Sequence, residues 1–134
     1  MSRSGYSEDY GCDNQWDLIR WRGAVASAIR GARGQLFLKE MLAAFDAIEP
    51  KRLIANDLIK GGEVCAIGSV GIKRGVDMTK FDPDDREGVA GVFGISPAMA
   101  AEIAFENDEG GPYNETPENR YARMRRWIEA QIKP

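Results

Sequence analysis

The side chains of this sequence that could do chemistry are its carboxylates, lysines, tyrosines and two cysteines, and the chain contains no histidine. Histidine is the usual general base, the usual partner of a serine or cysteine nucleophile, and the commonest ligand of catalytic zinc. Cys12 and Cys65 are far apart and form no Cys-x-x-Cys pair, so we expect two free thiols. The sequence therefore predicts a protein that is not an enzyme and that uses no cofactor and no metal. An enzyme that works through Asp or Glu is the least favoured alternative.

Two local patterns resemble ligand sites without the spacing that such sites require. The three glycines between residues 68 and 75 are spaced GxxGxxxG, and no Gly-Lys-Ser/Thr follows them, so they do not form a phosphate-binding loop. The acidic residues between 77 and 87 lack the alternating ligands, the central glycine and the final glutamate of a calcium loop. We expect them instead to start a helix, with Asp82 as its N-cap and Pro83 in its first turn.

Charge is distributed unevenly along the chain. Residues 76–119 carry eleven acidic and two basic side chains, whereas residues 120–134 carry five basic and one acidic. Two interpretations are open: the segments neutralise each other within the fold, or the acidic segment is a surface that steers a basic partner. Four acidic residues fall late in a predicted helix, where the helix dipole disfavours negative charge. They are the candidate partner-binding residues Glu102, Glu106, Asp108 and Glu109.

A second hypothesis is a nucleic-acid-binding regulator. Residues 89–103 resemble a helix-turn-helix, since small residues, a glycine turn and a capping Ser96 fall where that motif needs them. The second helix offers alanine, methionine and glutamate instead of the side chains that contact bases and phosphates, so we expect a hairpin of similar shape that does not read DNA. Binding would then use arginines on helix faces, namely Arg20, Arg22, Arg30, Arg33, Arg123 and Arg126.

The helices that carry these residues can be predicted in part. Composition is that of a globular protein, with 43% hydrophobic and 29% charged residues. We expect a flexible N-terminal tail over residues 1–13 and a single helical domain over 14–134. Apolar residues at helical spacing predict a first helix from Asn14. Its apolar stripe comprises Leu18, Trp21, Val25, Ala28, Ile29 and Ala32.

The first helix is predicted to form a hairpin with a second one. Gly31 and Gly34 bracket the turn, and the second helix runs from near Gln35 to Pro50. Its apolar face comprises Leu36, Phe37, Met41, Ala44, Phe45 and Ile48. Small residues recur every four positions on the other side of the first helix, which predicts close packing against a further backbone. These small residues are Gly23, Ser27 and Gly31.

Residues 52–70 allow two interpretations. One is a β-hairpin around Lys60-Gly61-Gly62, and the other is a pair of short helices broken at the two glycines. We favour helices because the surrounding segments are helical. Thr116 and Pro117 then start a last helix that ends near Ile132 and turns Arg123, Arg126 and Lys133 away from the core. The predicted fold is a mainly α-helical, single compact domain of about five to seven helices, with a short β-hairpin at 52–70 as the alternative.

Three phrases resemble a group of small proteins from tailed phages and prophages: "LIRWRGAVASAIRGARGQLFLKEML", "GEVCAIGSVGIKRG" and "ETPENRYARMRRWIEAQI". The likeness spans nearly the whole chain, identifies no site residues, and implies a phage-type protein acting in the bacterial cytosol. A polar, acidic N-terminus and the lack of an apolar run near 20 residues also predict a cytoplasmic protein. The leading hypothesis is a non-enzymatic protein that binds a protein partner, such as a host or anti-phage defence component that it inhibits. The oligomeric state is left open.

Overall fold

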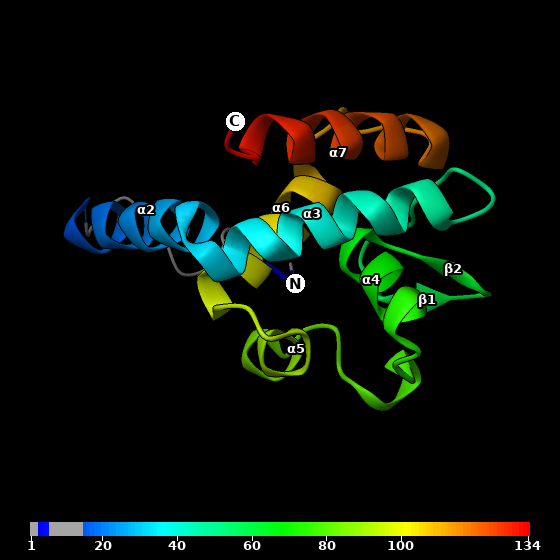
Figure 1. Cartoon of the computed structure of the whole chain (residues 1–134), viewed down its shortest axis with the longest axis horizontal. Coiled ribbons are helices and arrows are strands. Elements are labelled where there is room, and N and C mark those ends of the chain that lie inside the picture. The colour runs from blue at the N-terminus through cyan, green and yellow to red at the C-terminus, as the bar shows by residue number, and fades with distance from the viewer. Residues whose placement is uncertain (1–2, 6–14) are drawn as a thin grey trace.

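Six α-helices, one short 3-10 helix and a two-stranded hairpin make up the secondary structure of the computed structural model, which describes residues 3–5 and 15–134 (Figure 1). In chain order these elements are α2 (Gln15–Arg30), α3 (Ala32–Ala47), β1 (Ile59–Lys60), β2 (Glu63–Val64), α4 (Ala66–Arg74), η1 (Met78–Lys80), α5 (Arg86–Phe93), α6 (Pro97–Glu109) and α7 (Pro117–Gln131). The predicted mainly α-helical architecture is confirmed.

Helices α2 and α3 follow one another instead of folding back. Only Gly31 separates them, and its backbone is extended, with φ −66° and ψ 161°. One residue is too short for the loop of an antiparallel helix pair, and both helices run in the same direction along the molecule (Figure 1). The predicted hairpin is therefore wrong. Gly34 lies inside α3 and not in a turn. The carbonyl of Ala28 comes so close to it that a Cβ atom there would collide with this carbonyl.

The outer side of these two helices is exposed where packing was predicted. Gly23 and Ser27 are exposed, and a Cβ atom on Gly23 would meet no atom within 4 Å. Leu36, expected in the core, is 69% exposed, whereas Leu38 is fully buried. Helix α2 packs on α6 through its opposite stripe, of which Ile29 is the buried member. The predicted close contact of the small residues is thus wrong. In the apolar stripe predicted for the first helix, the side chain of Leu18 lies outside the described part of the chain.

The segment after α3 forms the β-hairpin. Strands β1 and β2 are antiparallel, with Ile59 opposite Val64 and Lys60 opposite Glu63. The turn residues Gly61 and Gly62 have φ of +60° and +80°, and a two-residue turn with positive φ at both positions suits the twist of a β-hairpin. The favoured helical interpretation is therefore wrong for residues 52–64. It holds from Ala66, where α4 begins.

Helices α5 and α6 meet at a sharp bend. Helix α5 starts later than predicted, because Asp85 and not Asp82 is its N-cap: the Gly88 N–H donates to Asp85 Oδ1 at 3.1 Å. The chain then turns at Gly94, Ser96 caps α6, and the two helix axes differ by 105°. This is the angle typical of a helix-turn-helix, so the predicted shape is confirmed.

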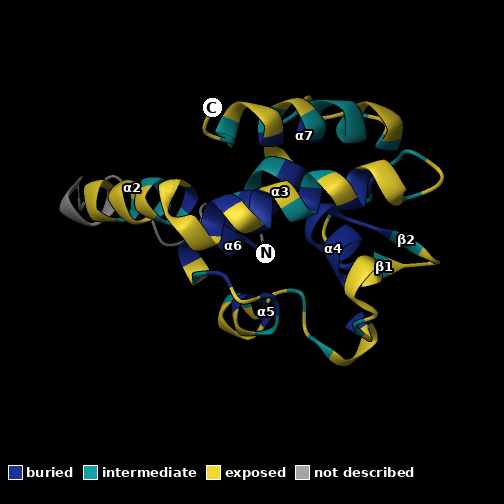
Figure 2. Ribbon diagram, viewed as in Figure 1, coloured by how far each residue is buried: buried dark blue, intermediate teal, exposed yellow. Residues whose placement is uncertain are grey.

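Helix α6 lies at the centre of the domain. It packs against α2, α4, α5 and α7, while α3 covers α4 and α7 (Figures 1 and 2). The largest fully buried side chains come from several elements: Phe45, Phe93, Leu38, Met41, Leu53, Ile67, Met99, Ile103, Met124 and Ile128. Of the described helices, none by itself has both the length and the apolar character needed to cross a membrane. Helices α5 and α6 have this length and character only when they are taken together, and they form a bent pair.

Residues 3–5 are buried against this core and do not belong to a loose tail. Arg3 and Ser4 are 3% and 1% exposed, and the Arg86 guanidinium donates to the Ser4 carbonyl at 2.8 Å. The predicted flexible tail therefore does not describe these three residues. The rest of the predicted tail, Cys12 included, lies outside the described residues, while Cys65 is a buried free thiol.

Candidate functional site

The four acidic residues predicted to bind a partner lie in different environments. The Asp108 side chain is only 5% exposed, and Arg3 donates to both of its oxygens at 2.7 Å. Glu106 is partly buried, with Oε2 3.9 Å from Arg123 Nη1. Glu102 is half-buried and Glu109 is exposed, and each has an interaction within the fold. Asp108 is thus an interior residue, which corrects its predicted place on a contact surface.

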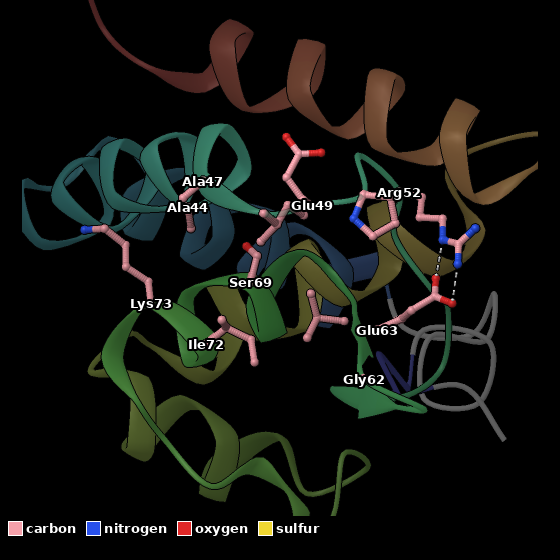
Figure 3. Close-up of a pocket in the computed structure, with 12 residues that line it drawn as sticks. Ala44, Ala47, Glu49, Arg52, Gly62, Glu63, Ser69, Ile72 and Lys73 are labelled. Atoms are coloured by element: carbon pink, nitrogen blue, oxygen red, sulfur yellow. Dashed lines mark hydrogen bonds and ion pairs between the residues drawn. The ribbon is translucent and has the colours of Figure 1, made fainter.

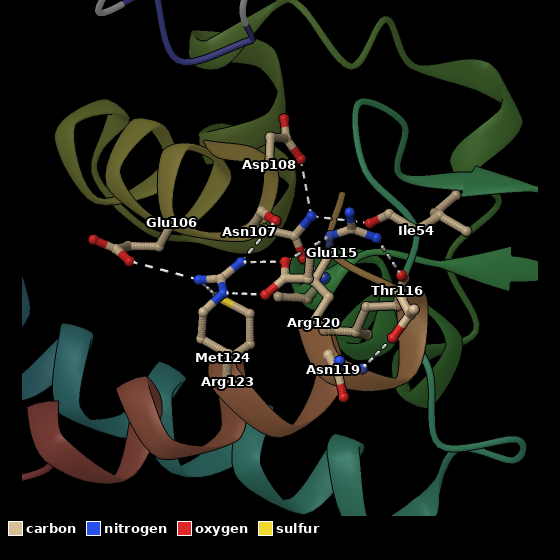
Figure 4. A network of polar contacts seen from close by, with 12 residues as sticks. Ile54, Glu106, Asn107, Asp108, Glu115, Thr116, Asn119, Arg120, Arg123 and Met124 are labelled. Atoms are coloured by element: carbon tan, nitrogen blue, oxygen red, sulfur yellow. Dashed lines mark hydrogen bonds and ion pairs between the residues drawn. The ribbon is translucent and has the colours of Figure 1, made fainter. Parts of the chain in front are cut away.

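A polar network joins the end of α6 to the start of α7 (Figure 4). Arg123 donates through Nε and Nη2 to the two oxygens of Glu115, at 2.6 and 2.9 Å. Arg120 donates to the Leu53 carbonyl at 2.9 Å, and its Nε lies 3.4 Å from Glu115. Arg123 was predicted to point outward and to contact nucleic acid. The structure turns it inward, because α7 packs across the acidic end of α6 and the loop that follows it.

Two glutamates of this network have opposite pKa shifts. Hydrogen bonds from Arg123 lower the pKa of Glu115, helped by the charges of Arg123 and Arg120, and burial opposes them only in part. Burial raises the pKa of Glu106, helped by the nearby charge of Glu102, and Arg123 compensates only in part. Part of the acidic segment, namely Glu106, Asp108 and Glu115, therefore pairs with arginines inside the fold, as one of the two interpretations expected.

Nine of the twelve arginines fall into two groups, and Lys39 joins the second. In the first, each guanidinium lies within ion-pair distance of a carboxylate: Arg3, Arg52, Arg74, Arg120, Arg123 and Arg125. In the second, exposed cations on α2 and α3 have no carboxylate partner among the residues that the structure describes: Arg22, Arg30, Arg33 and Lys39. Arg20 is exposed but has an interaction partner, and Arg126 is exposed on α7, outside the first group.

The second group defines a surface that we call the basic helix face: Arg22, Arg30, Arg33 and Lys39, together with Ile19 and Leu36. Ile19 is 59% exposed and Leu36 is 69% exposed. Exposed residues recur along the outer side of both helices (Figure 2). Residues 18–39 include five basic side chains and no acidic one, so nothing within this stretch offsets the positive charge.

The helix-turn-helix-like segment cannot contribute to a nucleic-acid surface through α6. Most of that helix is buried, including Ala98, Met99 and Ala101 near its start. A recognition helix has to present those early positions to the edges of bases. Of the candidate nucleic-acid residues, the structure therefore leaves exposed those on α2, on the start of α3 and at Arg126.

A groove of about 240 Å³ lies between the end of α3, the hairpin and α4 (Figure 3). Ala44, Ala47 and Val64 give it apolar walls, and the Arg52–Glu63 ion pair closes one end. The buried hydroxyl of Ser69 donates to the Ala66 carbonyl at 2.6 Å, so it is already used within α4. Sites for drug-sized ligands usually have about 300–1,000 Å³, so this groove is smaller than such sites.

The exposure of Ile19 and Leu36 was not predicted from the sequence. The signal that could have identified the basic helix face is the absence of any acidic residue over 18–39, next to a chain that is acidic elsewhere. Comparison with protein-family models, curated proteins and solved structures finds no match for this chain.

Proposed function

We propose that this protein is a non-enzymatic binding protein. Its basic helix face binds an acidic surface on a partner protein. The observation that carries the proposal is the contrast between the two groups of arginines. Those of the first group are matched by carboxylates, whereas Arg22, Arg30, Arg33 and Lys39 are exposed and unmatched in the described chain. A patch of one sign attracts and orients a partner of opposite charge.

The neighbouring side chains favour a protein over nucleic acid. Ile19 and Leu36 offer aliphatic area, and the small residues Gly23 and Ser27 between the cations let another backbone approach closely. Proteins that bind nucleic acid usually supplement phosphate contacts with polar side chains that read bases or with aromatic rings on which bases stack. The basic helix face has no aromatic ring for stacking, and two of its six members, Ile19 and Leu36, are aliphatic.

The resemblance to phage and prophage proteins supports a partner in the bacterial cytosol. A host protein or a component of anti-phage defence that carries an acidic surface fits this proposal. Inhibition would then follow from covering that surface. The acidic residues predicted earlier do not serve as the contact in this proposal, since Asp108 and Glu106 are used within the fold.

The test is a comparison of two charge-matched variants. In the first, Arg22, Arg30 and Arg33 are replaced by Gln; in the second, the exposed cations Lys60, Arg126 and Lys133 are replaced by Gln. Each variant loses the same charge, and exposed positions of this kind change stability by only about 0.5 kcal/mol each. Both are immobilised beside the wild type and exposed to bacterial lysate, and retained proteins are quantified by mass spectrometry.

We expect a specific protein to be retained by the wild type and by the second variant and to be lost from the first. Thermal melting of both variants checks that the fold is intact. Equal retention by both variants would refute the basic helix face as the binding site. A parallel titration with duplex DNA at several salt concentrations tests the alternative of nucleic-acid binding, since phosphate binding weakens steeply with salt. Strong DNA binding that the first variant abolishes would identify the protein as a nucleic-acid-binding regulator.

A further inference from the structure

The buried carboxylate of Asp108 is surrounded by hydrogen-bond donors. Arg3 donates through Nε to Oδ2 and through Nη2 to Oδ1, both at 2.7 Å. The Asn56 backbone N–H and the Asn107 side-chain amide also donate to Oδ1, at 3.0 and 2.9 Å. The remaining Arg3 nitrogen, Nη1, lies 3.5 Å from the Cys65 sulfur. This is the two-pronged geometry by which a carboxylate selects a guanidinium.

The domain holds this carboxylate in place without help from residues 3–5. The Asn107 Oδ1 accepts from the Ala66 N–H at 3.0 Å, and its Nδ2 donates to the Ile54 carbonyl at 2.9 Å. Asn56 has a φ of +72°, a conformation that asparagine tolerates better than most residues, and this turns its N–H toward Asp108. Three separate segments, the loop before β1, the start of α4 and the end of α6, therefore build a preformed socket.

Residues 3–5 occupy this socket as a ligand would. They belong to no helix or strand, yet Arg3, Ser4 and Gly5 are all buried. The void beside Arg3 measures only about 10 Å³, so its side chain fills the space between Leu58, Ile67 and Val89. Residues 3–5 are anchored by the Arg3 guanidinium and by the hydrogen bond from Arg86 to the Ser4 carbonyl. We call residues 3–5 the N-terminal strap.

We infer that the socket formed by Asp108, Asn107, the Asn56 N–H and Cys65 is a binding site for a guanidinium group, and that Arg3 is its tethered ligand. The chemical class that it takes is the arginine side chain of an extended segment. Lysine would not replace arginine, because an ammonium cannot donate to both carboxylate oxygens and to the sulfur from one plane. Because Arg3 belongs to the same chain as the socket, a free guanidinium compound competes poorly with it.

The test is chemical rescue of the full chain with Arg3→Ala. This change deletes the side chain beyond Cβ, and ethylguanidinium supplies the same two carbons and the guanidinium. We expect the melting temperature of Arg3→Ala to fall well below that of the wild type, since it leaves a carboxylate buried without its partner. Millimolar ethylguanidinium should raise the melting temperature of Arg3→Ala by about 5 °C in a saturable manner. It should leave the wild type unchanged.

Two controls make the rescue specific. Ethylammonium carries the charge without the planar fork and should give no saturable rise. The double variant Arg3→Ala/Asp108→Asn removes the carboxylate as well and should not respond to ethylguanidinium. If Arg3→Ala melts like the wild type, or if ethylammonium or the double variant gives the same rise, the inference is wrong.

A second readout covers the case in which Arg3→Ala does not fold by itself. Helix content is then followed by circular dichroism at low temperature while ethylguanidinium is added. Recovery of the wild-type spectrum with Arg3→Ala, and none with Arg3→Ala/Asp108→Asn, is the expected result. A failure to recover would overturn the socket. Neither outcome bears on the basic helix face, because that proposal does not involve Asp108 or the strap.

Discussion

Glu106 and Glu115 both lie beside Arg123, yet folding shifts their pKa values in opposite directions. Glu115 receives two hydrogen bonds from the guanidinium, and its side chain is 5% exposed. Glu106 is 3.9 Å from the same guanidinium at its closest, and it shares α6 with Glu102 one turn earlier. The difference is one of geometry, since a two-pronged pair offsets the cost of burial and a single distant contact does not.

The pKa shifts give a prediction with a definite sign. The pKa of Glu115 is lowered by folding, so its ionised form stabilises the fold above the ordinary glutamate value and loses that effect as pH falls. The pKa of Glu106 is raised, so its contribution is favourable at acidic pH and is lost as pH rises. At pH 7 we expect Glu115→Gln to lower the free energy of unfolding by about 3 kcal/mol. We expect Glu106→Gln to leave it unchanged or to raise it.

Urea denaturation at pH 7 and at pH 4 measures both effects. Near pH 4 the wild-type glutamates approach protonation in the unfolded chain, so the difference between the wild type and each variant should shrink. A loss at pH 7 that is as large for Glu106→Gln as for Glu115→Gln would mean that the Glu106–Arg123 contact is a strong ion pair. That result would contradict the raised pKa of Glu106.

At the scale of elements, the junction of α2 and α3 explains why similar glycines have different roles. Gly34 is in contact with the Ala28 carbonyl, and this close approach lets α3 begin after a single extended residue, Gly31. Gly23 lies within α2 with open space around its Cα. The sequence predicted close packing at Gly23 and a turn at Gly34, and both predictions are wrong. The neighbours of the two glycines in space separate the glycine that the junction requires from the one that it does not.

Alanine substitutions should therefore have opposite effects. Gly23→Ala should raise the free energy of unfolding by about 0.5–1 kcal/mol, because alanine loses less conformational freedom in a helix and meets no neighbour at this position. Gly34→Ala should lower it by about 1–3 kcal/mol, since the added methyl group has to displace backbone atoms. Thermal or urea unfolding of the two variants is sufficient. A stabilised Gly34→Ala variant would show that α2 can move away from α3 at no cost.

At the scale of the whole molecule, stability is concentrated around α6. Its neighbours α2, α4, α5 and α7 surround it, and Ala101 and Ile103 are completely buried. The described N-terminal half of α2 is different, because Ile19, Arg20 and Arg22–Ala24 are exposed. The basic helix face is thus carried partly by an element with few buried contacts. Such segments open locally at a lower free energy than the core.

Amide hydrogen exchange should resolve this gradient. We expect peptides that cover residues 19–24 to exchange much faster than peptides from α6, because local opening of α2 does not require the core to separate. The captured partner should slow exchange over residues 19–39 and leave the core unaffected. Equal protection of α2 and α6 in the free protein would show that the domain opens only as one unit. Protection confined to residues 102–109 on partner binding would return the contact to the acidic segment.

The sequence by itself determined the helical class of the fold and most of its boundaries. Ser96, Thr116 and the positive-φ glycine Gly94 act on backbone groups within a few residues, so their effect does not depend on the rest of the molecule. The absence of histidine and the charge pattern are likewise properties of the chain alone. The two-glycine turn of the hairpin was among the interpretations, although helices were favoured.

Only the tertiary structure decided which charges face inward. Arg123 and Asp108 read as surface residues, and the fold turns both inward. Glu115, in the loop after α6, pairs with Arg123, and Arg3, far away in the sequence, pairs with Asp108. Leu36 was predicted to lie in the core and is exposed, since α3 follows α2 in the same direction and the two helices do not fold back on one another (Figure 1). Periodicity tells which residues share a face of a helix. What covers that face depends on the path of the chain between elements, and here one extended residue, Gly31, set that path.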